Sequence, residues 1–175
     1  MQHNLFEWND NSSVISPKPI SKDKTNIAKQ LELFFEILYA GKTPRINSDG
    51  VTSHEAVTGG SFQTMSGGST GFPKVLERTC TSWILSFNTN DKNYNHSGSR
   101  VALFGSLTHS LSLYGALEAI FLGCEVHHLA GLSPSSQLEY LENKKIEILY
   151  VTPTQLRLML SACLLYTSPS PRDRG

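Results

Sequence analysis

Val101-Ala102-Leu103-Phe104-Gly105 is a short apolar run that ends in glycine, and residues 111–122 follow it as a longer, largely apolar segment before Gly123. The short run is typical of a buried strand, and the longer segment of a helix closed by a glycine. Two more strand-and-helix pairs follow this first one. In the first of them, a strand over residues 125–130 precedes a helix over residues 133–143. In the second, a strand over residues 146–151 precedes a helix that starts at Thr152-Pro153. Short connections in this alternation predict an α/β fold, with right-handed crossovers, a parallel sheet and flanking helices.

The turn after Gly105 is the first candidate site. It reads Ser106-Leu107-Thr108-His109-Ser110, and ligands of such sheets bind beyond the carboxyl ends of the strands. A histidine side chain can change its charge near neutral pH, which makes His109 a candidate functional residue. The alternative is that His109 caps the next helix or only completes the loop.

A second candidate lies upstream, where Ser66-Gly67-Gly68-Ser69-Thr70-Gly71-Phe72-Pro73-Lys74 combines glycines, hydroxyls and one lysine. Glycines allow positive φ and close approach of a ligand, so that successive N–H groups can form an anion-binding concavity. Ser66, Ser69 and Thr70 add hydroxyl donors and Lys74 adds a positive charge. The stretch predicts a phosphate-binding loop; the alternative is a Gly/Ser linker that happens to end in Pro-Lys.

The spacing of this loop argues against two common nucleotide motifs. A P-loop needs Lys-Ser/Thr directly after its second glycine, at the start of a helix, but Phe72-Pro73 separates Gly71 from Lys74. Proline also disfavours the helical region for the residue before it, so we expect an extended exit from the loop. The dinucleotide fingerprint G-x-G-x-x-G cannot be placed on these glycines either.

Residues Ser66–Lys74 resemble the phosphate-loop signature of the adenylate-forming enzymes, the superfamily of acyl-CoA synthetases, firefly luciferase and adenylation domains of nonribosomal peptide synthetases. The usual form is Thr/Ser, Ser/Gly, Gly, Ser/Thr, Thr, Gly, any residue, Pro, Lys. All the defined positions match. Two neighbours depart from the pattern, because Gln63 stands where a large apolar residue is common and Val75 where a small one is.

The resemblance implies an ATP-dependent ligase of the acyl-CoA synthetase kind. A small-molecule carboxylic acid would attack the α-phosphorus of ATP to give an acyl-adenylate and pyrophosphate, and a thiol, in the first instance CoA, would then take the acyl group. Residues Ser66, Gly67, Gly68, Ser69, Thr70, Gly71 and Lys74 would hold the β- and γ-phosphates together with Mg²⁺. Lys74 would act as an electrostatic clamp, and His109 matches a family histidine near the acyl carboxylate and the pantetheine channel.

Two other functions stay open on the sequence. One is an adenylation enzyme that loads the thiol of a carrier protein rather than CoA. The other is a non-catalytic module that binds a nucleotide or another anion. The acyl substrate cannot be assigned from these residues.

Composition narrows the classes of partner. The 175 residues are 39% hydrophobic, and 15 basic residues balance 15 acidic ones. A net charge of +0 gives no reason to expect nucleic acid or an anionic membrane surface as partner. The amino terminus lacks the pattern of a signal peptide, and the apolar stretch 111–122 is too short to span a membrane. Cys80, Cys124 and Cys163 show no paired or metal-type spacing. We therefore expect a cytoplasmic protein.

Residues 163–175 differ abruptly from the pattern before them and look like translated sequencing adapter. The alternative is a natural disordered Ser/Pro-rich tail. On the first interpretation residues 1–162 form a partial amino-terminal domain, with the phosphate loop at 66–74 and βα units over 100–162. The family's adenine, ribose and hinge segments would lie beyond residue 162, so we expect this chain to have little or no synthetase activity.

The remaining sequence gives coarser expectations. An amphipathic helix is expected over residues 25–39, strands over 61–65 and 75–80, and a short helix over 81–87 before a turn over 88–99. Residues 1–23 and 42–60 read as irregular. His127 and His128 lie on an expected strand and are interpreted as structural or surface residues.

Overall fold

A four-stranded parallel sheet is the centre of the carboxy-terminal half of the protein. The computed structural model describes residues 5–17, 26–56, 59–66 and 74–167. The sheet has the order β1-β7-β6-β8, and each neighbouring pair of strands is parallel. Its strands are β1 (Ser13–Ile15), β6 (Arg100–Leu103), β7 (Glu125–His128) and β8 (Ile148–Tyr150). The predicted α/β fold with a parallel sheet is confirmed.

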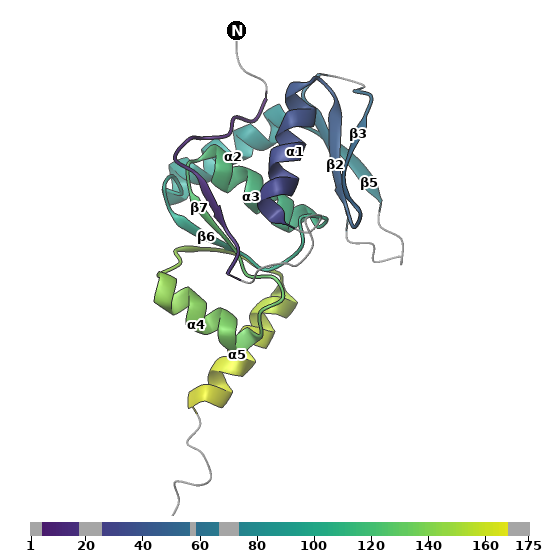
Figure 1. Cartoon of the computed structure of the whole chain (residues 1–175). Coiled ribbons are helices and arrows are strands. Elements are labelled where there is room, and N and C mark those ends of the chain that lie inside the picture. Colours follow the sequence, from purple (N-terminus) through teal and green to yellow (C-terminus); the bar gives the residue numbers. More distant parts are fainter. Residues whose placement is uncertain (1–4, 18–25, 57–58, 67–73, 168–175) are drawn as a thin grey trace, which may run out of the picture.

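Helices cover both faces of this sheet. They are α3 (Ser110–Phe121), α4 (Pro134–Lys144) and α5 (Pro153–Thr167), with α3 on one face and α4 and α5 on the other (Figure 1). The chain leaves β6 for β7 and then crosses back to β8 on the far side of β6. Right-handed crossovers in opposite directions place their helices on opposite faces. Gly123, at φ 71°, follows the end of α3 as predicted.

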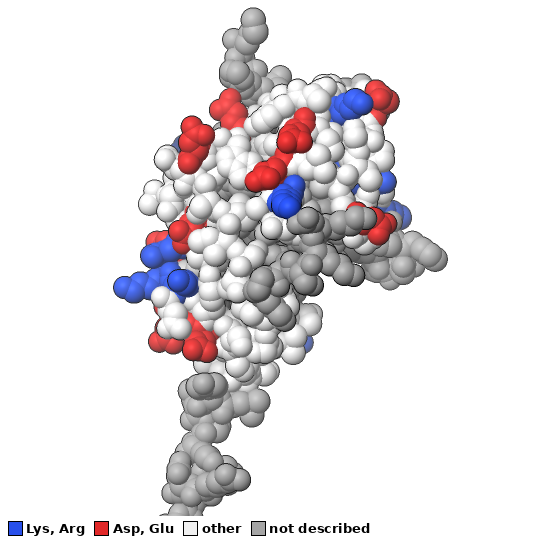
Figure 2. Space-filling view, viewed as in Figure 1, with Lys and Arg blue, Asp and Glu red and all other residues white. Residues whose placement is uncertain are grey.

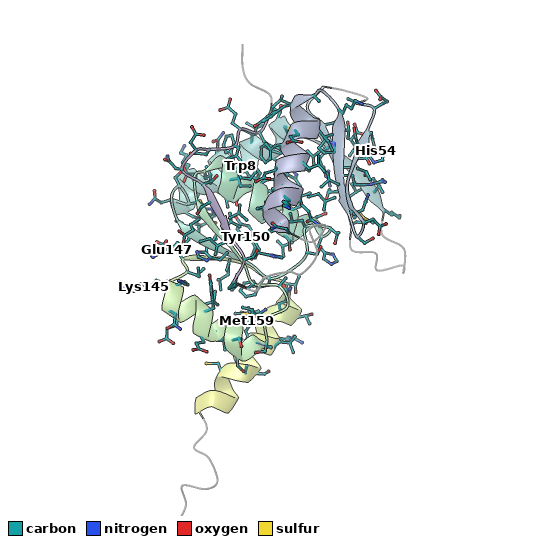
Figure 3. All side chains as sticks on the ribbon, in the orientation of Figure 1. Trp8, His54, Lys145, Glu147, Tyr150 and Met159 are labelled. Atoms are coloured by element: carbon teal, nitrogen blue, oxygen red, sulfur yellow. The ribbon has the colours of Figure 1, made fainter. Side chains whose placement is uncertain are left out.

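Alternate residues of β6 therefore enter two separate cores. Val101 and Leu103 pack with α3 in the larger core, whereas Ala102 packs with Phe104 and Met159 beneath the sheet. Figure 3 shows Met159 on α5, among the side chains between α4 and α5. Burial on both faces is why this strand reads as a continuous apolar run.

A second, mixed sheet carries the predicted phosphate loop. Its order is β3-β2-β4-β5, and its strands are β2 (Thr43–Asn47), β3 (Gly50–His54), β4 (Ser61–Met65) and β5 (Val75–Thr79). The last two confirm the strands expected on either side of the loop. The loop-like interpretation of residues 42–60 is wrong, since β2 and β3 form an antiparallel hairpin in which Asn47 pairs with Gly50. The dipeptide Asp49-Gly50 is a hairpin signal that the sequence interpretation overlooked.

Helix α1 (Ile27–Tyr39) packs between the two sheets, and helix α2 (Cys80–Tyr94) packs on β5 and α3. Helix α1 begins at Asn26, whose side chain accepts from the amides of Ala28 and Lys29. Helix α2 is longer than the predicted 81–87, and its Asn/Asp-rich second half is helical rather than a turn. Asn90 in that half donates hydrogen bonds to α3, so tertiary contacts override weak helix propensity.

An aromatic cluster joins the amino-terminal segment to these elements. Phe6 is fully buried, with its ring 5.4 Å from Phe62 on β4 and 5.7 Å from Phe87 on α2. Trp83 stands edge-on to Phe62 at 4.7 Å. The irregular structure expected over residues 1–23 is wrong for Ser13–Ile15, because these residues form β1, which pairs with β7 at the edge of the parallel sheet. The sequence of a three-residue strand does not show which distant strand it will pair with, so β1 could not be predicted from its own residues.

Charged residues are distributed over the surface in both signs. On the face shown in Figure 2, Lys and Arg lie interspersed with Asp and Glu among the described residues. No helix within the described part of the chain is long and apolar enough to cross a bilayer.

Candidate functional site

The two ends of the predicted phosphate loop lie next to each other at the end of a hairpin. Met65 on β4 pairs with Val75 on β5. Beyond that pair, the amide of Ser66 donates to the carbonyl of Lys74 at 2.9 Å, and the amide of Lys74 donates to Ser66 Oγ at 3.2 Å. The extended exit that Pro73 predicts is confirmed by β5. Gly67, Gly68, Ser69, Thr70 and Gly71, with Phe72 and Pro73, lie outside the described residues.

The turn that carries His109 meets this hairpin at its last described residues. His109 and Met65, the last residue of β4, form a parallel β-bridge, which is the one isolated β-bridge among the described residues. Ser110 Oγ also donates to the carbonyl of Met65 at 2.7 Å. Ser66 follows Met65 directly, so the structure brings one end of the loop and His109 together from positions 43 residues apart in the sequence.

His109 occupies the N-cap position of α3, but its side chain makes no capping hydrogen bond. The interpretation of this residue as a side-chain cap is therefore wrong. The turn is held instead by Ser106, whose Oγ accepts from the amide and the hydroxyl of Thr108. His109 and Lys74 are both exposed residues, so each is accessible from solvent.

A small cavity of about 150 Å³ lies beside the same turn. Its walls come from the turn after β6, the end of β7, the start of α1 and the β2–β3 hairpin; they include Ile27, Asn47, Ser106, Leu107, Thr108 and His128. This is the carboxyl edge of the parallel sheet, where ligands of such folds bind. A larger groove of about 640 Å³ lies between α4 and α5 and includes none of the predicted site residues.

His128 supports the turn and was not predicted to do so. It is buried, and its Nε2 lies 3.0 Å from the carbonyl oxygen of Gly105, which can only accept. Nε2 is therefore the protonated nitrogen of a neutral ring, and burial lowers the pKa of His128. The structural interpretation is confirmed and the surface alternative is wrong. Its position at the end of a parallel strand is the signal that points to this site.

His127 is likewise structural. It is buried, with Nε2 2.6 Å from Glu125 Oε1 and Nδ1 2.9 Å from the hydroxyl of Tyr140 on α4. These contacts join β7 to α4 and contribute nothing to the turn at His109. Among the described residues, no cluster of three or more His, Cys, Asp or Glu side chains could bind a metal ion. Cys80 and Cys124 are buried and Cys163 is exposed, and none of these three described cysteines forms a disulfide.

Curated proteins similar in sequence to this chain are ligases. An uncharacterized acyl-CoA ligase, YhfT, of Bacillus subtilis strain 168 is 39% identical over 88 residues, which is 50% of this chain and 18% of that protein. A protein of Staphylococcus epidermidis with the provisional name long chain fatty acid-CoA ligase VraA is 33% identical over 95 residues, covering 54% of this chain and 21% of the relative. The chain thus spans about a fifth of the length of the curated relatives it matches. No protein-family model matches it.

Solved structures give the same result at the level of the fold. An amide bond synthetase from Marinactinospora thermotolerans superposes with a TM-score of 0.52 and 19% identity, over 67% of this chain and 23% of that one. The o-succinylbenzoate CoA synthetase MenE from Bacillus subtilis gives a TM-score of 0.50 and 20% identity, over 57% of this chain and 21% of that one. Over about half of its length, therefore, this chain is similar in sequence to acyl-CoA ligases, and it shares its fold with part of the adenylate-forming enzymes.

Proposed function

We propose that this chain is part of an ATP-dependent ligase that activates a carboxylic acid as its acyl-adenylate. The observation that carries the proposal is the meeting of Ser66, Met65 and His109 at the carboxyl edge of the parallel sheet. The base of the predicted phosphate loop, at Ser66, and the exposed residue His109 are brought together there. The ligase names of the curated relatives support the same reaction class.

The described ends of the loop have the chemistry that the phosphates of ATP require. Ser66 Oγ accepts a hydrogen bond from the amide of Lys74, which leaves its own hydroxyl proton available to a phosphate oxygen. The exposed ammonium of Lys74 adds a positive charge at the other end. In the proposed reaction a carboxylate attacks the α-phosphorus and pyrophosphate leaves, so positioning and charge neutralisation are the main demands on the protein.

Mg²⁺ would share the charge of the β- and γ-phosphates as part of the nucleotide substrate. We assign residues 66–74 to those phosphates, His109 to the side of the acyl carboxylate, and CoA as the thiol of the second step. The acyl-CoA ligase names of the two curated relatives favour CoA over a carrier protein. We place the reaction in the cytoplasm, where ATP and CoA are supplied.

Catalysis is assigned to a longer protein that contains this segment. The chain covers about a fifth of its curated relatives, so we expect the 175 residues alone to have little or no synthetase activity. We also propose that residues 163–175 are adapter-derived and that the partial domain is residues 1–162. Sequencing the same locus beyond the codon for Ala162 tests that boundary.

The direct test is carboxylate-dependent exchange of pyrophosphate into ATP by the longer gene product. Replacement of Lys74 by Ala should slow exchange at least tenfold, about 1.4 kcal/mol of lost stabilisation, and Gly68→Val should do the same by blocking the approach of the backbone. Lys42→Ala, at another exposed lysine, is the matched control and should leave exchange unchanged. Unchanged exchange in both loop variants would refute the assignment.

A further inference from the structure

Two hydroxyl groups link the hairpin to the start of α3. Thr64 Oγ1 on β4 lies 2.7 Å from Ser110 Oγ, and Ser110 Oγ lies 2.7 Å from the carbonyl oxygen of Met65. Each hydroxyl has a single proton, and a carbonyl can only accept. Ser110 must therefore donate to Met65, and Thr64 must donate to Ser110. The three groups form one directed chain of hydrogen bonds.

These two hydrogen bonds lie next to the candidate site in the sequence. Ser110 is the residue immediately after His109, and Met65 is the residue immediately before Ser66. Thr64 is 4% exposed and Ser110 is half-buried, so the Thr64 end of the link is shielded from water. The hydrogen bonds thus fix the first turn of α3 against the strand that leads into residues 66–74.

We propose that Thr64 and Ser110 are positioning residues, which hold His109 in register with the base of the phosphate loop. The inference rests on the proposed function and deepens it, because it names residues that would set the distance between the pyrophosphate end of ATP and the imidazole. Neither residue touches substrate; each acts through the backbone that it fixes. Misplacement of a reacting group by about 1 Å can cost a large part of a catalysed rate.

Variants of Ser110 that lack or keep the hydroxyl distinguish a positioning role of this residue from a role in packing alone. Ser110→Ala leaves the carbonyl of Met65 without its donor and the Thr64 hydroxyl without its acceptor. Ser110→Thr keeps the hydroxyl and should rescue the link. Ser86→Ala is the matched control. Ser86 Oγ on α2 makes a similar 2.6 Å contact with the hydroxyl of Tyr114, which lies on α3 as Ser110 does, but this contact does not involve the hairpin.

Two measurements on the 175-residue chain are needed. The first is the set of nuclear Overhauser contacts between His109 or Ser110 and Met65 or Ser66. The second is the affinity for pyrophosphate with Mg²⁺, measured by calorimetry. In Ser110→Ala we expect the contacts to be lost and the affinity to fall about fivefold, which corresponds to about 1 kcal/mol. Ser110→Thr and Ser86→Ala should match the unmodified chain in both.

The outcomes distinguish this inference from the function on which it rests. Unchanged contacts in Ser110→Ala, or an equal loss in Ser86→Ala, would overturn the positioning role whatever the chain binds. Absence of pyrophosphate binding by the unmodified chain would count against the phosphate loop. In that case the contacts alone would decide whether the two hydroxyls hold His109 in place.

Discussion

Glu118 on α3 accepts a hydrogen bond from the side-chain amide of Asn90 on α2, with 2.8 Å between Glu118 Oε1 and Asn90 Nδ2. The carboxyl group is 1% exposed, and its other oxygen lies 3.9 Å from Nδ1 of His96. Burial raises the pKa of Glu118 from 4.5 to about 7, against the opposing effect of the hydrogen bonds from Asn90 and Tyr114. The α2–α3 interface therefore contains a buried acid whose pKa is raised toward the neutral range.

The first prediction is that this acid makes the protein less stable as pH rises. Between about pH 4.5 and 7 the folded state binds more protons than the unfolded state at Glu118, so its contribution is complete below that window and lost through it. The expected loss of unfolding free energy is about 3 kcal/mol, since a pKa difference of one corresponds to about 1.4 kcal/mol. Urea unfolding at pH 5 and pH 8, followed by tryptophan fluorescence, measures it.

The comparison must be made against Glu118→Gln, because other groups titrate in the same range. Burial lowers the pKa values of His127 and His128, which makes stability rise with pH below about 6.5. These histidines are present in both proteins, and their effect cancels in the difference. Glu139→Gln, at an exposed residue, is the control. If Glu118→Gln and the unmodified chain show the same change from pH 5 to pH 8, the buried acid is not the cause.

A second prediction concerns the link from β7 to α4 through His127. In a neutral imidazole one nitrogen donates and the other accepts, so Nε2–H donates to Glu125 and the Tyr140 hydroxyl donates to Nδ1. Tyr140→Phe leaves Nδ1 without a partner in a buried place and should lower the free energy of unfolding by about 1–3 kcal/mol. The same change at Tyr94, which is 70% exposed, should have an effect below about 0.5 kcal/mol. Equal effects in urea unfolding would contradict the proposed link.

A third prediction tests how closely α3 packs on the parallel sheet. A Cβ added to Gly115 would lie 2.6 Å from Cγ of Tyr150 and 2.9 Å from Cδ2 of Leu103. Gly115→Ala should therefore destabilise the protein by about 1–3 kcal/mol, although alanine alone would favour a helix by about 1 kcal/mol. A second change, Tyr150→Leu, should recover part of the loss by removing the ring. A more stable Gly115→Ala protein in thermal unfolding would show that the contact is looser than described.

The sequence predicts the elements whose own residues determine them. The buried run Val101–Gly105, the glycine after α3 and the Ser133-Pro134 start of α4 are local signals, and each element lies where it was expected. Strand β1 and the second half of α2 depend on partners far along the chain, namely β7 and Tyr114. No short window of sequence contains those contacts, so both were missed.

The candidate site divides in the same way. Residue types and spacing single out Ser66–Lys74, and resemblance adds His109. Neither the residue pattern nor the resemblance shows that Met65 forms a β-bridge with His109. They also do not show that the hydroxyls of Thr64 and Ser110 are hydrogen-bonded to each other. Those contacts arise from the packing of the mixed sheet against the start of α3. On the proposed function, they set the distance between the base of the predicted phosphate loop and His109.

We propose that residues 66–74 hold the pyrophosphate end of ATP. Calorimetric titration of the 175-residue chain with pyrophosphate and Mg²⁺ measures this binding, with Lys74→Ala as the loop variant and Lys42→Ala as the control. We expect the unmodified chain and Lys42→Ala to bind, and Lys74→Ala to bind about tenfold more weakly, a difference of about 1.4 kcal/mol. Equal affinity in all three proteins, or no binding by any of them, would contradict it.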